Sequence, residues 1–283
     1  MIDSHAHYSH TRFDGTYRYL TVREGEIEIA EGNRAAIFEE MKRAGFTDYI
    51  EPAIGIDSNR RVLDWCHTSM GFAHPAVGVH PTRTYLAEWS DRHLLEDYTR
   101  EEGVVAIGET GLDYHHPRLR QHRHLQKKWF RYQLGLASRR GLPLILHIRE
   151  ADNDAVKILR RFRSKIVGGV AHCFYGDYAT AKQYLDLGLH IGIGGGLLQA
   201  SPRAEALREA VKSIPLERIL LETDAPYVLP DRTDAHGNPL PKKARNTSLL
   251  IPLVAEEIAR IKGLDVQAVL STTTANAKRL FKI

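Results

Sequence analysis

The segment Val104-Val105-Ala106-Ile107-Gly108-Glu109-Thr110 joins a short apolar run to a carboxylate that follows it almost directly. Short runs of branched apolar residues, bounded by glycine or polar residues, are typical of parallel strands that are buried on both faces. Similar runs precede His147 and Asp224. The pattern therefore indicates a parallel sheet with polar residues where its strands end.

Eight runs of this kind occur along the 283 residues. They predict strands at residues 1–2, 49–54, 73–79, 104–107, 142–146, 166–171, 190–193 and 218–222. Apolar residues at helical spacing predict helices between them, for example at residues 34–44, 59–70, 122–139, 154–162, 179–187 and 204–214. About eight alternations of strand and helix in a chain of this length predict an α/β fold, a (β/α)8 TIM barrel.

The composition favours a single domain over residues 1–283, because no Pro-, Gly- or Ser-rich linker divides the chain. The formal net charge is +4, with basic clusters at residues 118–131 and 160–165. Such clusters either attract phosphate backbones or form solvated outer faces of helices. The sequence leaves both interpretations open.

The cellular location is expected to be cytoplasmic, with no membrane partner. Two cysteines, Cys66 and Cys173, do not make a disulfide framework, and the start of the chain lacks the pattern of a secretory signal. No apolar stretch approaches the roughly 18 residues of a membrane span. Cys173 is expected to be a small buried apolar residue rather than a metal ligand.

Six side chains are candidate metal ligands because they follow predicted strands. They are His5, His7, Glu109, His147, His172 and Asp224. In a (β/α)8 barrel the C-terminal ends of the strands surround the active site. One buried histidine is more often a hydrogen-bonded core residue, but a cluster of buried imidazoles and carboxylates is costly unless it is coordinated.

Two divalent ions fit this ligand set better than one, because a tetrahedral zinc needs only four ligands. Imidazole and carboxylate donors suit Zn, Mn, Fe or Ni and also admit Mg. His5 and His7 are two residues apart, so on an extended segment both side chains point to the same face. A carboxylate shared between the two ions is expected.

The motifs of this chain resemble those of the TatD family of metal-dependent hydrolases, within the amidohydrolase superfamily. The matching segments are Asp3-Ser-His5-Ala-His7, Gly78-Val-His80-Pro81, Gly108-Glu109-Thr-Gly-Leu-Asp113-Tyr114, Leu142-Pro-Leu-Ile-Leu-His147-Ile-Arg149-Glu150, His172-Cys-Phe-Tyr-Gly176, Leu221-Glu222-Thr-Asp224-Ala-Pro226-Tyr227 and Asn276-Ala-Lys-Arg-Leu-Phe281. They occur in the family's order along nearly the whole chain. The resemblance implies a barrel with a pair of divalent metal ions.

The resemblance also implies a division of the ligands between the ions. His5, His7, Glu109 and Asp224 would hold the first ion, and Glu109 would bridge to a second ion held by His147 and His172. The implied activity is that of a metal-dependent deoxyribonuclease, often acting on single-stranded DNA from the 3′ end. Some relatives instead remove D-amino acids from tRNA.

Roles for the remaining site residues follow from their chemistry. Asp224 is expected to act as general base besides binding metal, with Glu109 as the second catalytic carboxylate. Arg149 is a candidate phosphate ligand, or the partner of a nearby carboxylate such as Glu150. His80 is a candidate substrate contact, and Glu222 is expected to orient a ligand histidine.

Residues 8–32 form an insertion where the family passes quickly from its first strand to a helix. Residues 16–22 and 26–30 favour β-structure on either side of a turn that contains Gly25, which predicts a hairpin. At the mouth of the site it would narrow access, present Tyr17 and Tyr19 for base stacking, or pack on the rim.

Two other functional classes remain open at the level of sequence. The same ions could serve an amidohydrolase, a lactonase or an aminoacyl-tRNA deacylase that attacks a carbonyl carbon. Alternatively, the barrel could bind metal without catalysis, although the complete ligand set argues against this. The sequence predicts a nucleic acid, above all DNA, as the partner, and it predicts no oligomeric state.

Overall fold

The computed structural model describes residues 1–283 except 70, 232, 234–236 and 242. One sheet of eight strands lies within these described residues, in the order β1-β4-β5-β6-β7-β8-β9-β10. Its strands are β1 (Ile2–Asp3), β4 (Asp48–Pro52), β5 (Ala73–Val77), β6 (Ala106–Asp113), β7 (Leu144–Arg149), β8 (Gly169–Ala171), β9 (His190–Ile193) and β10 (Ile219–Leu221). The strand pairs from β5 through β9 are parallel. This order, with helices between the strands, confirms the predicted (β/α)8 topology.

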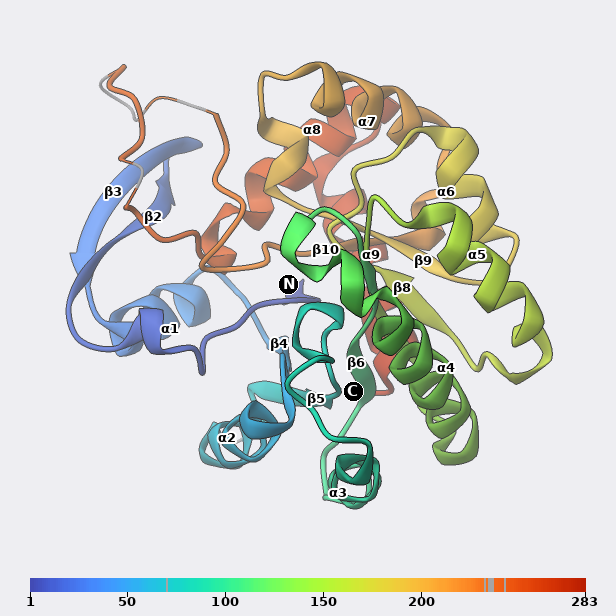
Figure 1. Ribbon diagram of the computed structural model, residues 1–283. Coiled ribbons are helices and arrows are strands. Elements are labelled where there is room, and N and C mark those ends of the chain that lie inside the picture. Colours follow the sequence, from blue (N-terminus) through green and yellow to red (C-terminus); the bar gives the residue numbers. More distant parts are fainter. Residues whose placement is uncertain (70, 232, 234–236, 242) are drawn as a thin grey trace. The chain divides into compact units, whose positions relative to one another are not determined.

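Helices follow most of the strands (Figure 1). They are α1 (Arg34–Arg43), α2 (Ile56–Thr68), α3 (Arg92–Tyr98), α4 (Arg123–Arg140), α5 (Asp152–Arg161), α6 (Tyr178–Leu185), α7 (Pro202–Ser213), α8 (Ile251–Lys262) and α9 (Val266–Phe281). The six helices predicted from the sequence are confirmed to within a few residues, although Met70, the predicted end of one of them, lies outside the described part. Within that part, no helix has both the length and the apolar character needed to cross a membrane.

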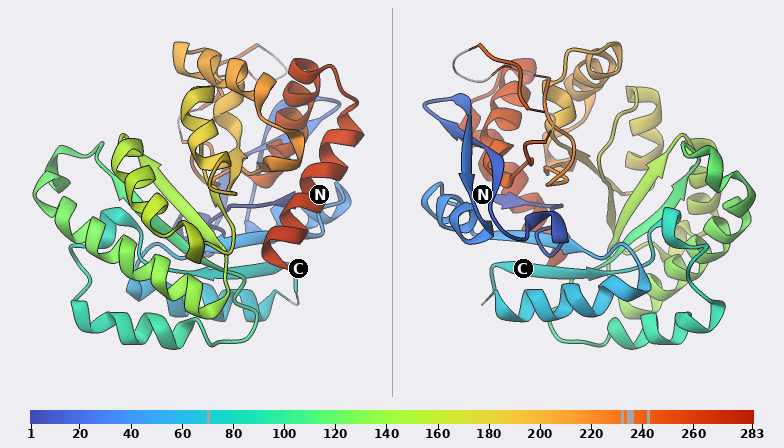
Figure 2. Two further views of the ribbon diagram at one scale, coloured as in Figure 1. Left: turned by 90° about the vertical axis from the view of Figure 1, so that its right-hand side faces the viewer. Right: turned by 60° about the vertical axis from the view of Figure 1, so that its left-hand side comes forward.

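The chain divides into two compact units. The first unit contains residues 1–49, 173–181 and 192–277, and the second contains residues 50–172, 182–191 and 278–283. In the first unit the two ends of the sheet meet, because Ser4 N donates to Leu221 O at 2.9 Å and Asp224 N donates to His5 O at 2.9 Å. The first strand is therefore held by the segment that follows the last one. Figure 2 shows α7 alongside α8 in the same unit.

In the second unit, α4 packs along β6 and fixes two loops of the candidate site. Gln126 and Gln133 are seven residues apart on its buried face. The Gln126 side chain accepts from Asp113 N and donates to Asp113 O, both at 2.9 Å. Gln133 bonds the backbone of Val79 in the same way, at 2.8 and 3.1 Å. These buried amides set the positions of Asp113 and of His80, which follows Val79.

The insertion forms the predicted hairpin, from β2 (Tyr17–Arg23) and β3 (Glu26–Gly32) in antiparallel pairing. Glu24 and Gly25 both have positive φ, 51° and 81°, which is the conformation that a two-residue hairpin turn uses. The free edge of β2 is also paired, since Leu20 N donates to Arg245 O at 2.9 Å. Figure 1 shows the hairpin beside α1.

The hypothesis that Tyr17 and Tyr19 stack on bases is wrong. Their side chains are only 6% and 2% exposed. The Tyr17 ring lies under the Arg245 guanidinium, and the Tyr19 hydroxyl donates to Glu40 of α1 at 2.8 Å. Both rings attach the hairpin to the rest of the first unit.

Candidate metal centre

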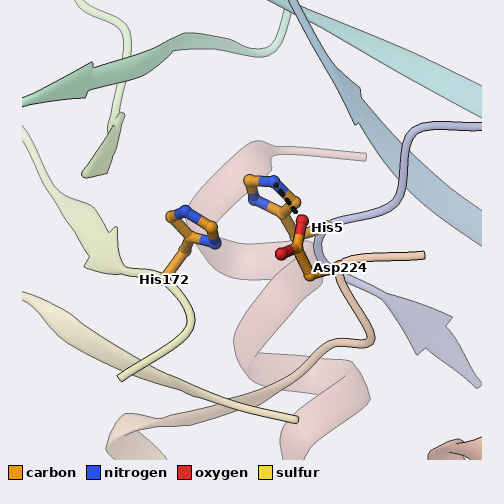
Figure 3. A group of neighbouring side chains, drawn as sticks. All are labelled: His5, His172 and Asp224. Atoms are coloured by element: carbon orange, nitrogen blue, oxygen red, sulfur yellow. Dashed lines mark ion pairs between the residues drawn. The ribbon is translucent and has the colours of Figure 1, made fainter. Parts of the chain in front are cut away.

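In the first unit, His5, His7 and Asp224 point toward one another. The Nε2 atoms of His5 and His7 are 3.1 Å apart. They lie 3.7 and 3.3 Å from Asp224 Oδ1, and Figure 3 draws the pairing of His5 with Asp224. Ala6, between the histidines, is fully buried and forms a parallel bridge with Ala225. Two imidazole nitrogens and a carboxylate oxygen that converge in this way are a suitable donor set for a divalent cation.

A buried carboxylate that sequence reasoning did not assign to the site supports this group. Asp3 is fully buried and accepts hydrogen bonds from His5 N at 3.1 Å and from Ser248 Oγ at 2.7 Å. It also accepts from the backbone and hydroxyl of Thr223. Burial raises the pKa of Asp3 to about 6, against the opposing effect of these hydrogen bonds. Asp3 ties the His5 backbone to the segment that carries Asp224.

In the second unit, Glu109 is surrounded by imidazoles. Its Oε2 is 2.8 Å from His172 Nε2, 3.4 Å from His147 Nδ1 and 3.8 Å from His80 Nε2. The nearest nitrogens of His147 and His172 are 3.1 Å apart. Within this set, the ligand atoms of His80, Glu109 and His147 all lie within 4.8 Å of one another, which is close enough to bind a cation.

The expected place of Glu109 at a strand end is wrong, because β6 continues to Asp113. The register of β6 against β7 shifts between Ile107 and Thr110, so Glu109 lies at an irregularity within the strand. Bulges of this kind redirect a side chain from the regular alternation of a strand.

Asp113 is the second site residue that sequence reasoning missed. Its Oδ2 is 3.3 Å from His147 Nε2, on the side of the ring opposite to Glu109. Burial alone would raise the pKa of Asp113, but the hydrogen bond and charge of His147, together with a hydrogen bond from the His115 backbone, lower the pKa to about 2. Burial alone would lower the pKa of His147, but hydrogen bonds to Asp113 and Glu109 raise it to about 9. A carboxylate on the far nitrogen is the usual way to orient a metal-binding imidazole.

A family model named "TatD related DNase" matches residues 2–282. The chain belongs to the TatD related DNase family. This membership confirms the resemblance that the motifs carry.

Individual relatives of this TatD family chain match along most of their length. The metal-dependent hydrolase YabD of Bacillus subtilis is 33% identical over 268 residues, which are 95% of this chain and 98% of the relative. The 3′-5′ ssDNA/RNA exonuclease TatD of Edwardsiella piscicida is 34% identical over 252 residues, 89% of this chain and 94% of the relative. The crystal structure of YjjV, a TatD homologue from Escherichia coli K12, superposes with a TM-score of 0.81 at 26% identity, over 100% of this chain and 98% of that one.

His80 of this TatD chain is a neutral hydrogen-bond donor. Its Nδ1 accepts from Thr82 N at 3.1 Å, which places the ring proton on Nε2, the atom that faces Glu109. Burial and the charge of the neighbouring His147 together lower the pKa of His80 to about 3. His80 therefore contacts the Glu109 cluster directly.

Arg149 is half-buried in β7 of the TatD chain, two residues after His147. The carboxylates expected as alternative partners are engaged elsewhere, since Glu150 pairs with His115 at 2.6 Å and Asp152 accepts from Tyr184 at 2.7 Å. Within the described residues, Arg149 forms no ion pair. Its guanidinium keeps its full donor capacity for a ligand.

The side chains of Glu222 and Asn246 each form a hydrogen bond with the backbone next to a candidate ligand. Glu222 is buried and accepts from Cys173 N, so it fixes the residue that follows His172. Asn246 donates to Thr223 O at 2.8 Å and holds the segment before Asp224.

Cys173 is half-buried rather than buried as expected. Of the basic residues at 118–131, Lys127 forms an ion pair with Asp154 at 2.7 Å.

Proposed function

We propose that the protein is a divalent-metal-dependent phosphodiesterase that removes nucleotides from an end of single-stranded DNA. The observation that carries the proposal is the pair of imidazole and carboxylate clusters, one in each unit, in a TatD family chain. The relatives named 3′-5′ ssDNA/RNA exonucleases support a nucleic acid substrate. Residues 1–283 would act as one domain, in the cytoplasm.

The ligand assignment of the proposal follows the two clusters. His5, His7 and Asp224 would hold one ion, His147 and His172 a second, and Glu109 would bridge the two. When bound, two divalent ions lower the pKa of a coordinated water and polarise a phosphoryl oxygen. Zn, Mn, Mg, Ni and Fe all suit these donors.

Protein side chains would orient the substrate and move the proton. Asp224 would accept the proton of the attacking water, because its carboxylate lies among the ligands. His80 would donate a hydrogen bond from Nε2 to an oxygen bound beside Glu109. Arg149 would bind a phosphate with two parallel hydrogen bonds, which its planar guanidinium favours over a lysine amine.

The test is cleavage of single-stranded DNA labelled at the 3′ or the 5′ end by metal-stripped protein resupplied with Mg, Mn or Zn. Asp224→Asn should lower the rate by about 10² to 10⁴-fold, the usual contribution of a general base. Asp186→Asn is the matched control, because Asp186 is exposed and forms a surface ion pair with Lys182. Early release of the 3′ label would establish the direction.

Metal content is measured on the same samples, so that an inactive enzyme can be interpreted. If wild-type protein binds metal, leaves DNA intact and hydrolyses a lactone or an aminoacyl ester, the site attacks carbonyl carbon and the proposal is wrong. If metal-loaded wild-type protein turns over none of these substrates, the barrel binds metal without this catalysis.

A further inference from the structure

Arg12 lies at the start of the insertion, close to the first metal cluster. It belongs to a single 3₁₀ turn, η1 (Thr11–Phe13), in which Arg12 N donates to His10 Nδ1 at 3.0 Å. Its guanidinium carbon is 5.0 Å from the centre of the Tyr227 ring. The Tyr227 hydroxyl is 3.3 Å from His10 Nε2, so the ring that Arg12 covers is held from the same segment.

Tyr227 places this guanidinium one ring away from a candidate metal ligand. The centres of the Tyr227 and His7 rings are 6.2 Å apart in an edge-on arrangement. His7 in turn is 3.3 Å from Asp224. Arg12, Tyr227 and His7 all belong to the first unit. A group bound by Arg12 therefore lies beside the proposed site of cleavage.

A second guanidinium lies near the first. Arg245 covers the Tyr17 ring at 3.9 Å, and its backbone is pinned to both Arg18 and Leu20 of the hairpin. Burial lowers the pKa of Arg245, and the charge of Arg12 lowers it further. Asn246, the residue after Arg245, donates from N to Pro226 O at 3.3 Å, next to the Tyr227 that Arg12 covers. The ring of Phe13, the residue after Arg12, is 5.6 Å from the Tyr17 ring that Arg245 covers. The two guanidinium groups therefore extend from neighbouring segments, and their positive charges repel each other.

No carboxylate among the described residues neutralises this pair. Asp14, on the same segment as Arg12, is bound to Arg34 at 2.8 Å. Arg12 is exposed and Arg245 is half-buried, so a ligand from solvent can reach both. Like charges that lack an internal partner are the arrangement expected of an anion site.

We propose that Arg12 and Arg245 form a clamp for a phosphate of the substrate strand that neighbours the phosphate being cleaved. The inference rests on the proposed function, and it gives the insertion a role in holding the strand. Guanidinium groups bind phosphate oxygens in pairs of parallel hydrogen bonds, and their aromatic supports limit the side-chain entropy lost on binding. A bound phosphate also removes the repulsion between the two arginines.

The first experiment measures equilibrium binding of a fluorescent oligothymidylate to metal-free protein, in which no cleavage occurs. Arg12→Ala and Arg245→Lys should each weaken binding about tenfold, since a hydrogen bond to a charged group contributes this much or more. Arg18→Ala is the matched control, because Arg18 is an exposed arginine of the same hairpin. Unchanged affinity in both variants would overturn the clamp. Thermal unfolding of each variant shows that it is folded.

The second experiment locates the phosphate. Oligonucleotides that carry one neutral methylphosphonate at successive positions are bound to wild-type protein and to Arg12→Ala. At the clamped position the substitution should weaken wild-type binding by a larger factor than it weakens the binding of Arg12→Ala, in which Arg245 alone contacts the phosphate. If the methylphosphonate weakens the binding of the variant and of the wild type by the same factor at every position, Arg12 contacts no particular phosphate and the clamp is wrong.

The outcomes separate this inference from the proposed function. If the wild-type protein trims DNA and both arginine variants bind DNA as tightly as the wild type, the proposed function stands and the clamp is wrong. If binding is lost at one phosphate position but the protein fails to cleave DNA, the clamp stands and the proposed nuclease activity is wrong.

Discussion

Asp3 shows how one buried side chain positions a candidate metal ligand. It receives hydrogen bonds from the His5 backbone and from Thr223 and Ser248, which lie more than 200 residues further along the chain. Its carboxylate is removed from water but remains hydrogen bonded. The position of His5 therefore depends on an acid that does not itself point at the cluster.

Asp3→Asn should change how stability depends on pH in the metal-free protein. The pKa of Asp3 is about 6 in the folded chain against an ordinary value of 3.8, a difference of about two units. A raised pKa stabilises the folded state below about pH 4, and this contribution is lost as the pH rises through 6. Two units correspond to about 3 kcal/mol, so the free energy of unfolding of the wild type should fall by that amount relative to the variant.

The measurement is urea unfolding of both proteins between pH 4 and 7. Asp186→Asn serves as the control, since its exposed carboxylate should produce no such trend. If the free energies of unfolding of wild type and Asp3→Asn differ by the same amount at every pH in this range, the raised pKa of Asp3 is contradicted.

The candidate ligands could be predicted one at a time, but their supporting residues could not. His5 and His7 follow from alternation along an extended segment, and the order of the motifs indicated the other four. Asp113 bonds His147, 34 residues away, and Asp3 bonds Thr223, 220 residues away. Periodicity contains no information about contacts at such separations.

At the scale of elements, the sequence predicted strands better than helices. All eight strands are present, but α3, α8 and α9 are not among the helices that were named from the sequence. Helix α3 has only seven residues, and α9 contains a run of Ser and Thr, residues that compete with helical hydrogen bonds. The apolar residues that begin α8 give the pattern of a buried element, which periodicity alone does not assign to helix or strand.

The hairpin is joined to α1 through one carboxylate, and Glu40→Ala tests this attachment. The hydroxyls of Tyr19 and Thr21 each donate to Glu40 at 2.8 Å, and both residues are buried. Glu40→Ala leaves the two buried hydroxyl groups without their acceptor, so we expect the free energy of unfolding to fall by about 2 kcal/mol or more.

Glu39→Ala is the matched control for urea unfolding, because the exposed Glu39 side chain forms a surface ion pair with Lys42. Glu39→Ala should lower the free energy of unfolding only slightly, because exposed ion pairs of this kind contribute little to stability. Equal loss of stability in the two variants would show that the hairpin is not held through Glu40.

At the scale of the whole molecule, each compact unit contains one of the two clusters. The members of each cluster come from segments far apart in sequence, so a complete donor set exists only in the folded chain. An ion that binds the folded form alone must stabilise it, by about 2.7 kcal/mol at a concentration one hundred times its dissociation constant.

Added Mn or Zn should therefore raise the unfolding temperature of the metal-stripped protein, and more at pH 8.5 than at pH 7. The pKa of His147 is about 9 without metal, so its proton must leave before the ring can bind an ion. Calorimetry of wild type, His172→Asn and the exposed control His67→Asn provides the test. If metal raises the unfolding temperature of His172→Asn as much as that of the control, His172 is not a ligand.

The hydrogen bonds that Asp3 accepts from Thr223 and Ser248, which lie 220 and 245 positions later, set an order of events during synthesis. A ribosome adds about 5 to 20 residues per second, so the nascent chain carries its first strand for on the order of ten seconds or more before Ser248 emerges. Until then the Asp3 carboxylate lacks the Ser248 hydroxyl, and Asp224 has emerged for only the last part of that time. The complete donor set of the first cluster therefore forms only after most of the chain has been synthesised.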